Sequence, residues 1–214
     1  GVLYNFIFAI LCYIAIMAIW GSSYIRNEDS CIYPNELGVE MGFKAGDRIL
    51  RMDDYVPENF GMLQADLVRR DVEKVVVLRD GDTVDVYIDH SKIGDVLNTP
   101  DMFDLAVPFV IDSVMSFSPN VDAGLMHGDR IIALDSISTP FLQDMKAYLA
   151  GVPGATVSAS VLRGTDTLTI PVLVDSLGRI GAYTQIPAYT TKTYSVLEAI
   201  PAGFNLTFST IGGY

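Results

Sequence analysis

Residue types that commonly carry out chemistry are few in this sequence. Its 214 residues include two histidines, His90 and His127, and neither has a second histidine four positions away, the spacing that places two imidazoles on one helix face. The two cysteines, Cys12 and Cys31, do not form the paired spacing of a zinc site. No serine, histidine and aspartate set suggests nucleophilic catalysis. We therefore predict no catalytic residue and no metal site within this chain.

The charge balance limits the kinds of partner. Lysine and arginine number 14 and aspartate and glutamate 26, so the formal net charge is −12. Because phosphates are bound by basic surfaces, this balance argues against nucleic acid as a partner. It also argues against binding to an anionic membrane surface by charge. Recognition of a peptide or protein segment is the remaining expectation.

An apolar segment occupies the N-terminus. No charged residue precedes Arg26, and the residues from Val2 to Trp20 are almost all aliphatic or aromatic. About 20 apolar residues suffice to cross a bilayer as a helix, and Trp20 and Tyr24 lie near one end, where aromatic rings favour the interface. A signal peptide is the alternative, but the segment lacks a basic start and a clear cleavage site. We predict a transmembrane helix over residues 1–25.

An internal repeat organises the rest of the chain. Gly46-Asp47-Arg48-Ile49 recurs 82 positions later as Gly128-Asp129-Arg130-Ile131. Leu78-Arg79-Asp80-Gly81-Asp82-Thr83 corresponds to Leu162-Arg163-Gly164-Thr165-Asp166-Thr167, at an offset of 84. In each copy glycine and aspartate favour a tight turn before a strand. Since solenoids need more copies, two copies predict tandem domains.

Each copy has the same order of expected elements: a turn, a strand, a short helix and a hairpin. In the second copy the helix carries Phe141, Met145 and Leu149 at helical spacing. We therefore expect a fold that is mostly β with short helices, plus the N-terminal transmembrane helix. The expected domains are residues 26–93 and 94–180, and residues 181–214 form a linker that approaches a further membrane helix.

The repeated motifs resemble the PDZ domain in its bacterial, periplasmic form, over about residues 32–89 and 103–175. Ser118-Pro119-Asn120-Val121-Asp122-Ala123-Gly124-Leu125 is similar to the Ser-Pro-Ala-x-x-Ala-Gly-Leu segment of that family, with Asn120 in place of the usual alanine. The resemblance implies a groove between a strand and a helix, where an extended peptide joins the sheet. The candidate groove residues are Leu105, Val107, Phe109, Val110, Ile111, Phe141, Met145 and Leu149.

Two features leave alternatives open for this groove. Leu105-Ala106-Val107 departs from the hydrophobic-Gly-hydrophobic loop that usually holds a C-terminal carboxylate. The groove could instead exclude bulky substrates, or be filled by the chain itself. Each of these apolar side chains could also belong to a domain core.

The N-terminal segment resembles a second family. Gly1-Val2-Leu3-Tyr4-Asn5-Phe6-Ile7-Phe8-Ala9 is similar to the start of the second membrane helix of site-2-type intramembrane metalloproteases, which include the regulators of the sigma-E response. Val2 stands where the family usually has proline. Gly178-Arg179-Ile180-Gly181-Ala182 resembles the segment that follows the second PDZ domain there. The resemblance implies that Asn5 lies near the active site of the parent protein.

The second resemblance implies an internal fragment of a zinc metalloendopeptidase that performs regulated intramembrane proteolysis. Zinc would be held outside this chain, by a His-Glu-x-x-His helix before Gly1 and an aspartate after Tyr214, and the fragment itself would bind no cofactor. The expected partners are the lipid bilayer and membrane protein substrates, whose segments the PDZ pair would recognise or filter by size.

Charge near the membrane segment suggests its orientation. Arg26 is followed by Glu28 and Asp29, so the basic cluster typical of the cytoplasmic side is missing there. We expect a bacterial inner-membrane protein with periplasmic PDZ domains. A non-enzymatic, membrane-anchored PDZ adaptor is the main alternative. The PDZ portion of a trypsin-like periplasmic protease is a weaker alternative, because those proteins place PDZ domains after the catalytic domain.

Overall fold

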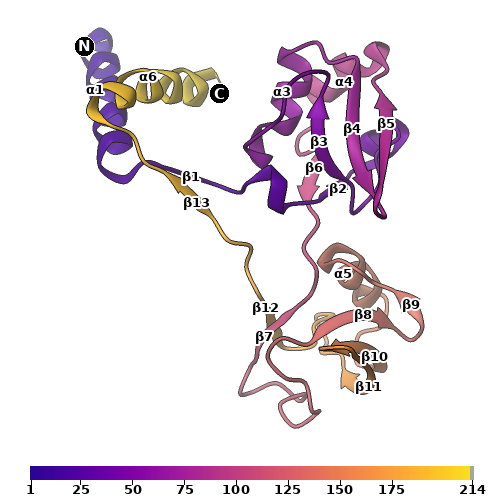
Figure 1. Ribbon diagram of the computed structural model, residues 1–214. Coiled ribbons are helices and arrows are strands. Elements are labelled where there is room, and N and C mark those ends of the chain that lie inside the picture. The colour runs from indigo at the N-terminus through magenta and orange to yellow at the C-terminus, as the bar shows by residue number, and fades with distance from the viewer. Residues whose placement is uncertain (213–214) are drawn as a thin grey trace.

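The computed structural model describes residues 1–212 as two β-rich units and a pair of helices near the chain ends (Figure 1). The fold is β-rich with short helices and one long apolar N-terminal helix, which confirms the predicted fold class. Each β-rich unit has its own hydrophobic core. We call them the first unit (residues 26–106) and the second unit (residues 107–185).

The helix pair consists of α1 (Val2–Trp20) and α6 (Val196–Gly212). The stretch Leu3–Trp20 has a mean hydropathy of 2.1 and is long and apolar enough to cross a membrane. The two helices pack closely at Gly203, where an added Cβ would lie 2.5 Å from the Ile14 backbone nitrogen. The rings of Phe6 and Phe208 also meet edge to face, 5.7 Å apart. The expected linker 181–214 thus contains a 17-residue helix, while Gly213 and Tyr214 lie outside the described residues.

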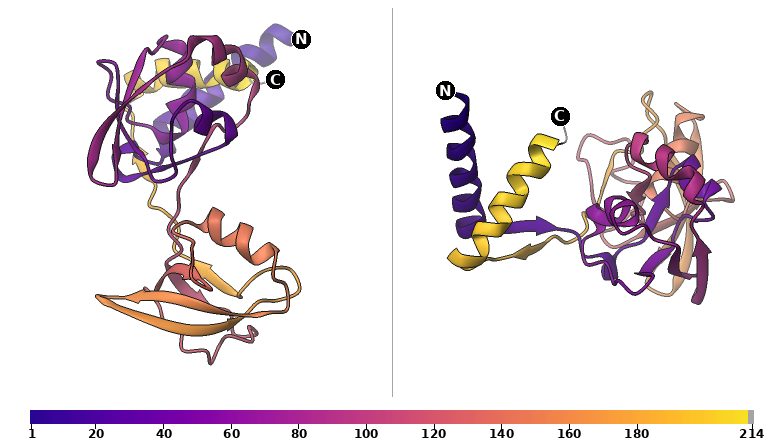
Figure 2. Two further views of the ribbon diagram at one scale, coloured as in Figure 1. Left: turned by 90° about the vertical axis from the view of Figure 1, so that its right-hand side faces the viewer. Right: turned by 90° about the horizontal axis from the view of Figure 1, so that it is seen from above.

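A short ribbon connects the helix pair to the β-rich units. It pairs β1 (Ser22–Tyr24) with β13 (Thr190–Lys192) in antiparallel fashion, so the chain leaves and returns along the same path (Figures 1 and 2). The Ser23 and Thr191 hydroxyl oxygens lie 3.1 Å apart across it. A two-stranded ribbon is only marginally stable alone, so its pairing depends on the helices and units at its two ends.

The first unit contains two small sheets. The three-stranded sheet has the order β3 (Arg48–Met52), β4 (Lys74–Arg79) and β5 (Asp82–Tyr87), and the second sheet pairs β2 (Ile32–Pro34) with β6 (Phe103–Leu105). The helices are η1 (Asn27–Asp29), α2 (Glu36–Glu40), η2 (Phe60–Met62), α3 (Leu63–Arg69), η3 (His90–Lys92) and α4 (Ile93–Asn98). Phe43, Ile49, Leu63, Leu67 and Met102 are among its fully buried side chains.

The second unit has a similar construction. Its larger sheet has the order β11 (Asp166–Leu173), β10 (Thr156–Arg163), β8 (Arg130–Leu134) and β9 (Ile137–Ser138). Its smaller sheet pairs β7 (Ile111–Val114) with β12 (Ala182–Thr184), and its helix is α5 (Leu142–Ala150). The inner face of α5 buries Met145 and Leu149 against this core.

Both domain boundaries differ from the prediction. The strand β6 was assigned to the second domain, yet it pairs with β2, and Val96 and Met102 are buried in the first core. Likewise, β12 follows the predicted end at residue 180 but completes the second unit. Each unit is closed by a strand that comes after its hairpin and pairs with its first strand. Because such pairing joins residues far apart in the sequence, no local sequence pattern indicated that β6 and β12 belong to these units.

The repeated turn is held by the same ion pair in both units. Asp47 receives hydrogen bonds of 2.8 and 2.7 Å from Arg79, and Asp129 receives two of 2.7 Å from Arg163. Each arginine also bonds the carbonyl of the glycine that lies four positions before the Gly-Asp motif, Gly42 or Gly124. The Gly-Asp motif and the later arginine are therefore two halves of one structural contact.

Candidate functional site

The strand available for peptide addition in the second unit is β12 rather than β7. On one side β7 pairs with β12. On the other, Ile111 bonds the turn before β8, accepting from Gly128 N at 2.8 Å and donating to Asp129 O at 2.8 Å. Among the described strands, β12 pairs only with β7, so its other edge is unpaired. The prediction placed the groove beside Phe109–Val114, where the Ile111 N–H and C=O are already bonded to the turn before β8.

The loop that leads into β12 lies next to the C-terminal end of α5. Ala182 packs against the core that contains Met145 and Leu149 of α5. Gly178, in the loop that leads into β12, approaches the C-terminal end of the helix, where an added Cβ would lie 3.1 Å from Leu149 O. We call the unpaired side of β12, together with the preceding loop 175–181, the β12 edge.

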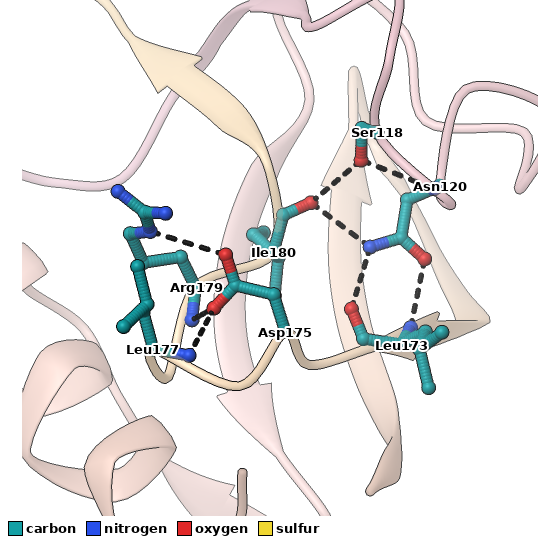
Figure 3. Close-up of polar contacts among 7 residues, drawn as sticks. All are labelled: Ser118, Asn120, Leu173, Asp175, Leu177, Arg179 and Ile180. Carbon is teal, nitrogen blue, oxygen red and sulfur yellow. Dashed lines mark hydrogen bonds and ion pairs between the residues drawn. The ribbon is translucent and has the colours of Figure 1, made fainter. Parts of the chain in front are cut away.

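Asp175 shapes the first half of the loop (Figure 3). Its Oδ1 accepts hydrogen bonds of 2.8 Å from the backbone N–H groups of Leu177 and Arg179, and its Oδ2 accepts one of 3.1 Å from Arg179 Nε. Burial alone would raise the pKa of Asp175, but these bonds outweigh it and hold the pKa below its ordinary value. The carboxylate therefore stays charged and keeps the loop closed at neutral pH.

Asn120 anchors the second half of the loop from inside the unit. Its Nδ2 donates to Ile180 O at 2.9 Å and Leu173 O at 2.8 Å, while its Oδ1 accepts from Leu173 N at 2.7 Å (Figure 3). Ser118 Oγ also donates to Ile180 O, at 3.2 Å. The side chain of Asn120 thus ties the loop to the end of β11, a role that alanine, usual at this position in the resembling family, cannot perform.

Two backbone donors just before β12 lack an acceptor among the described residues, and one of them belongs to Ile180, which is 3% exposed. In the described part of the chain, neither the Ile180 N–H nor the Gly181 N–H has a hydrogen-bond acceptor. Gly181 has a φ of 66°, and an added Cβ would lie 2.8 Å from Ser118 Cβ, so only glycine fits here without displacement. Consecutive free backbone donors can bind an anion such as a terminal carboxylate. Ile180-Gly181-Ala182 is also a hydrophobic-Gly-hydrophobic segment, the pattern missing at Leu105-Ala106-Val107.

The corresponding edge in the first unit is already occupied. Met102 immediately precedes β6, and its N–H donates to Gln64 Oε1 of α3 at 2.9 Å. At the other end of the strand, Leu105 N bonds Asp104 Oδ1 at 2.8 Å and Leu105 O accepts from Gln143 Nε2 at 2.7 Å. The two units therefore differ: the edge of the first is bonded by its own Gln64 and by Gln143 of the second unit, and the second leaves its edge free.

The contact between the units is formed by the start of α5. Phe141 lies over Gly46, with its ring carbon 3.1 Å from the position of an added Cβ, and meets the Tyr33 ring edge to face at 6.2 Å. Tyr33 OH donates to Asp144 Oδ1 at 2.8 Å. Burial, with this hydrogen bond, raises the pKa of Tyr33 to about 12. The hydroxyl therefore stays protonated and able to donate throughout the physiological range.

Replacing Tyr33 with phenylalanine is expected to weaken the contact between the units by about 1 kcal/mol, because one partly buried hydrogen bond is lost. Since folding raises this pKa from 10.0 to about 12, the stabilisation is complete below pH 10 and is lost as pH rises through about 12. A difference titration of tyrosine absorbance between the parent and Tyr33→Phe proteins measures the pKa of Tyr33. A value near 10 would contradict the contact.

The predicted groove residues occupy three kinds of place. Phe109, Ile111, Met145 and Leu149 are core residues, each less than 5% exposed. Leu105 and Phe141 lie at the contact between the units, and Val107 O accepts from Leu142 N at 2.7 Å within the second unit. Val110 O accepts from Gln185 N at 2.8 Å beside β12. On the helix pair, the side chain of Asn5 is exposed on α1.

Sequence reasoning missed the residues that form the loop. Asp175, Ile180 and Gly181 become a site only when β12 pairs with β7, although the segment Gly178-Arg179-Ile180-Gly181-Ala182 was noted as a motif. Within residues 1–212, no group of three histidine, cysteine, aspartate or glutamate side chains is placed to hold a metal ion. The residues described here therefore do not fit a zinc site.

Solved PDZ domains resemble part of this chain. The PDZ domain of an SdrC-like protein from Listeria monocytogenes is 23% identical, covers 36% of this chain and 86% of that one, and has a TM-score of 0.32. The corresponding domain from Listeria innocua is 21% identical and covers 39% of this chain and 99% of that one, also with a TM-score of 0.32.

A larger protein also shows partial similarity. An aminopeptidase N family protein from Idiomarina loihiensis is 26% identical over 44% of this chain and 15% of its own length, with a TM-score of 0.27. No family model matches the sequence.

Proposed function

We propose that this chain is a membrane-anchored peptide-recognition module built from two PDZ-type domains, in which the second unit receives the peptide. The observation that carries the proposal is the β12 edge. It combines an unpaired strand, a loop beside the C-terminal end of α5, and N–H groups without acceptors in the described chain at Ile180 and Gly181. An extended peptide would add to β12 through backbone hydrogen bonds, and its terminal carboxylate would accept from the two free donors.

The two units have different roles in this proposal. Gln64 and Gln143 already satisfy the edge of the first unit, so that unit serves as a scaffold that holds α5 from its N-terminal side. The contacts at Tyr33 and Phe141 keep the second unit oriented while its β12 edge stays free.

The wider function follows from the family resemblance. We place the chain in a bacterial inner-membrane zinc metalloprotease of the site-2 type, with the two units on the periplasmic side. The units would select extracytoplasmic segments of membrane protein substrates. When bound elsewhere in the parent protein, zinc would supply the activated water for peptide hydrolysis. The residues of this chain would contribute recognition and membrane anchoring.

Peptide binding to the β12 edge can be tested by NMR on the ¹⁵N-labelled full chain in lipid nanodiscs. The probe is acetyl-Ser-Thr-Val-Ala with a free carboxylate, compared with the same peptide as its C-terminal amide. The free acid is expected to shift the Ile180 and Gly181 amide signals and to bind about tenfold more tightly than the amide.

Gly181→Ala provides the matched variant, because its Cβ would collide with Ser118 and displace the free N–H groups. It is expected to weaken binding of the free acid about tenfold. Gly94→Ala is the control, since an added Cβ there meets no atom within 4 Å. If both peptides left the Ile180 and Gly181 signals unchanged, or bound equally to the parent and Gly181→Ala proteins, the proposed site would be wrong.

A further inference from the structure

A surface groove of about 400 Å³ lies where the ribbon meets α6. One wall consists of residues 192–194, which lead from β13 toward α6, and the other consists of Glu198, Pro201, Ala202 and Asn205 on α6. This volume lies within the range of sites that hold a small molecule. We call it the α6 groove. It is separate from the β12 edge, because its walls contain no residue of either β-rich unit.

The helix pair and its ribbon contain only two charged side chains, and both line this groove. Residues 1–25 and 186–214 include one cation, Lys192, and one anion, Glu198. Neither forms an ion pair within the described part of the chain. Glu198 Oε2 accepts hydrogen bonds of 2.9 and 2.7 Å from the backbone N–H and the hydroxyl of Ser195. The α6 groove therefore presents a positive and a negative group that do not neutralise each other by contact.

The register of the ribbon gives the depth of the groove relative to a membrane. The apolar helix α1 ends at Trp20, and Ser22, two residues later, pairs with Lys192. Two residues of extended chain cover about 7 Å, and the headgroup layer on each side of a bilayer is about 5–7 Å thick. The Lys192 ammonium also lies 5.8 Å from the centre of the Tyr194 ring, and aromatic rings favour this layer. With α1 across the bilayer, the groove lies among the lipid headgroups.

From this level α6 runs back along α1, into the layer that α1 crosses (Figure 2). Gly203 packs against the Ile14 backbone, and further along Phe208 meets Phe6. Phe204 and Phe208 are 47% and 48% exposed, and each lies three positions after a groove residue, so they continue the same side of the helix. A molecule with a charged head and an apolar tail matches this order of charged groove and apolar helix surface.

The two charges also select the kind of head. The Lys192 ammonium is a donor and suits a phosphate, whereas the Glu198 carboxylate is an acceptor and suits a cation that carries N–H groups. A purely anionic head, such as phosphoglycerol, meets Lys192 but is repelled by Glu198. The quaternary ammonium of phosphocholine has no N–H to donate. Phosphoethanolamine carries both a phosphate and a primary ammonium group, so it complements both walls.

We propose that the α6 groove binds the headgroup of phosphatidylethanolamine, with its phosphate at Lys192, its ammonium at Glu198 and its acyl chains along Phe204 and Phe208. The inference rests on the membrane anchoring in the proposed function, but not on peptide recognition. A lipid held here contacts the ribbon and α6 together. It therefore fixes the ribbon, which is only marginally stable alone, at the bilayer surface.

Native mass spectrometry of the detergent-solubilised full chain tests the proposal. The probes are the dioleoyl forms of phosphatidylethanolamine, phosphatidylcholine and phosphatidylglycerol, which differ only in the headgroup. Phosphatidylethanolamine is expected to bind with a Kd about tenfold lower than either of the others. Soluble phosphoethanolamine, which lacks acyl chains, is expected to displace it only at concentrations more than about a hundredfold higher.

Two variants separate the roles of the charges, and both replace exposed side chains. Lys192→Gln removes the partner of the phosphate and is expected to weaken phosphatidylethanolamine binding about tenfold. Glu198→Gln keeps an acceptor for Ser195 but loses its charge, so it is expected to bind phosphatidylethanolamine no better than phosphatidylcholine. Lys146→Gln, which removes an exposed lysine from α5 of the second unit, is the matched control and should bind like the parent protein.

Three outcomes would overturn the proposal. The first is equal binding of the three lipids to the parent protein. The second is unchanged phosphatidylethanolamine binding in both Lys192→Gln and Glu198→Gln. The third is displacement by soluble phosphoethanolamine at an equal concentration, which would indicate a site for the free headgroup. If the free-acid peptide still shifts the Gly181 amide in any of these cases, the lipid site fails while the proposed peptide site stands.

Discussion

Replacing Asp129 with alanine is expected to destabilise the second unit by about 3 kcal/mol, because it removes a buried carboxylate and leaves the donors bonded to it without their acceptor. The Asp129 side chain is 1% exposed and accepts two bonds of 2.7 Å from Arg163 and one of 2.8 Å from Met126 N. Its loss also frees the turn that begins β8. Chemical denaturation, followed by NMR signals from each unit, measures the change.

Two variants set the scale for this prediction. Asp166→Ala removes an exposed carboxylate at the start of β11 and is expected to change stability by less than about 0.5 kcal/mol. Asp47→Ala removes the corresponding aspartate of the first unit and should destabilise that unit instead. Equal stability of the Asp129→Ala and Asp166→Ala proteins would contradict the role assigned to the ion pair.

The ion pair between Asp129 and Arg163 should also make the stability of the second unit depend on pH in acid. The hydrogen bonds from Arg163 lower the pKa of Asp129 below its ordinary value of 3.8. For a carboxyl whose pKa is lowered by folding, the stabilisation is complete above the ordinary pKa and is lost as pH falls through the lower, folded value. The parent protein should therefore lose more stability than Asp129→Ala when pH is reduced below about 4.

Asn120→Leu is expected to destabilise the second unit by about 3 kcal/mol and to release the loop of the β12 edge. The substitution leaves Leu173 N–H without its acceptor and removes one donor from each of Leu173 O and Ile180 O, and each buried group left without a partner costs about 1–3 kcal/mol. Leucine has nearly the same size, so the cost reflects lost hydrogen bonds. Denaturation measures stability, and hydrogen exchange at residues 173–182 measures release of the loop.

The control is Asn98→Leu, where an exposed asparagine makes a single bond of 2.8 Å from its Nδ2 to Gly94 O. We expect that change to cost less than about 0.5 kcal/mol. Asn120→Leu should also abolish the carboxylate-dependent shift at Gly181. If the shift persisted with unchanged affinity, the loop would not depend on Asn120 for its shape.

Local features of this chain could be read directly from the sequence. The apolar run identified α1, and the spacing of Phe141, Met145 and Leu149 identified α5. The Gly-Asp motif identified both repeated turns, because a glycine with positive φ and a short side chain that bonds nearby backbone leave a strong local pattern. Turns, periodic helices and hairpins depend on neighbours within a few residues, and sequence reasoning succeeded there.

The site depended on contacts between distant residues. The β12 edge exists because residues 182–184 pair with residues 111–114, and Asn120 reaches loop residues about 60 positions away. The first unit closes its own edge through Gln64 and through Gln143 of the other unit, and nothing near either glutamine in the sequence indicates this. Non-local pairing is set by packing of the whole unit, which selects one partner among many strands of similar local propensity. For that reason, only the tertiary structure decided which edge strand is unpaired and which is already bonded by side chains.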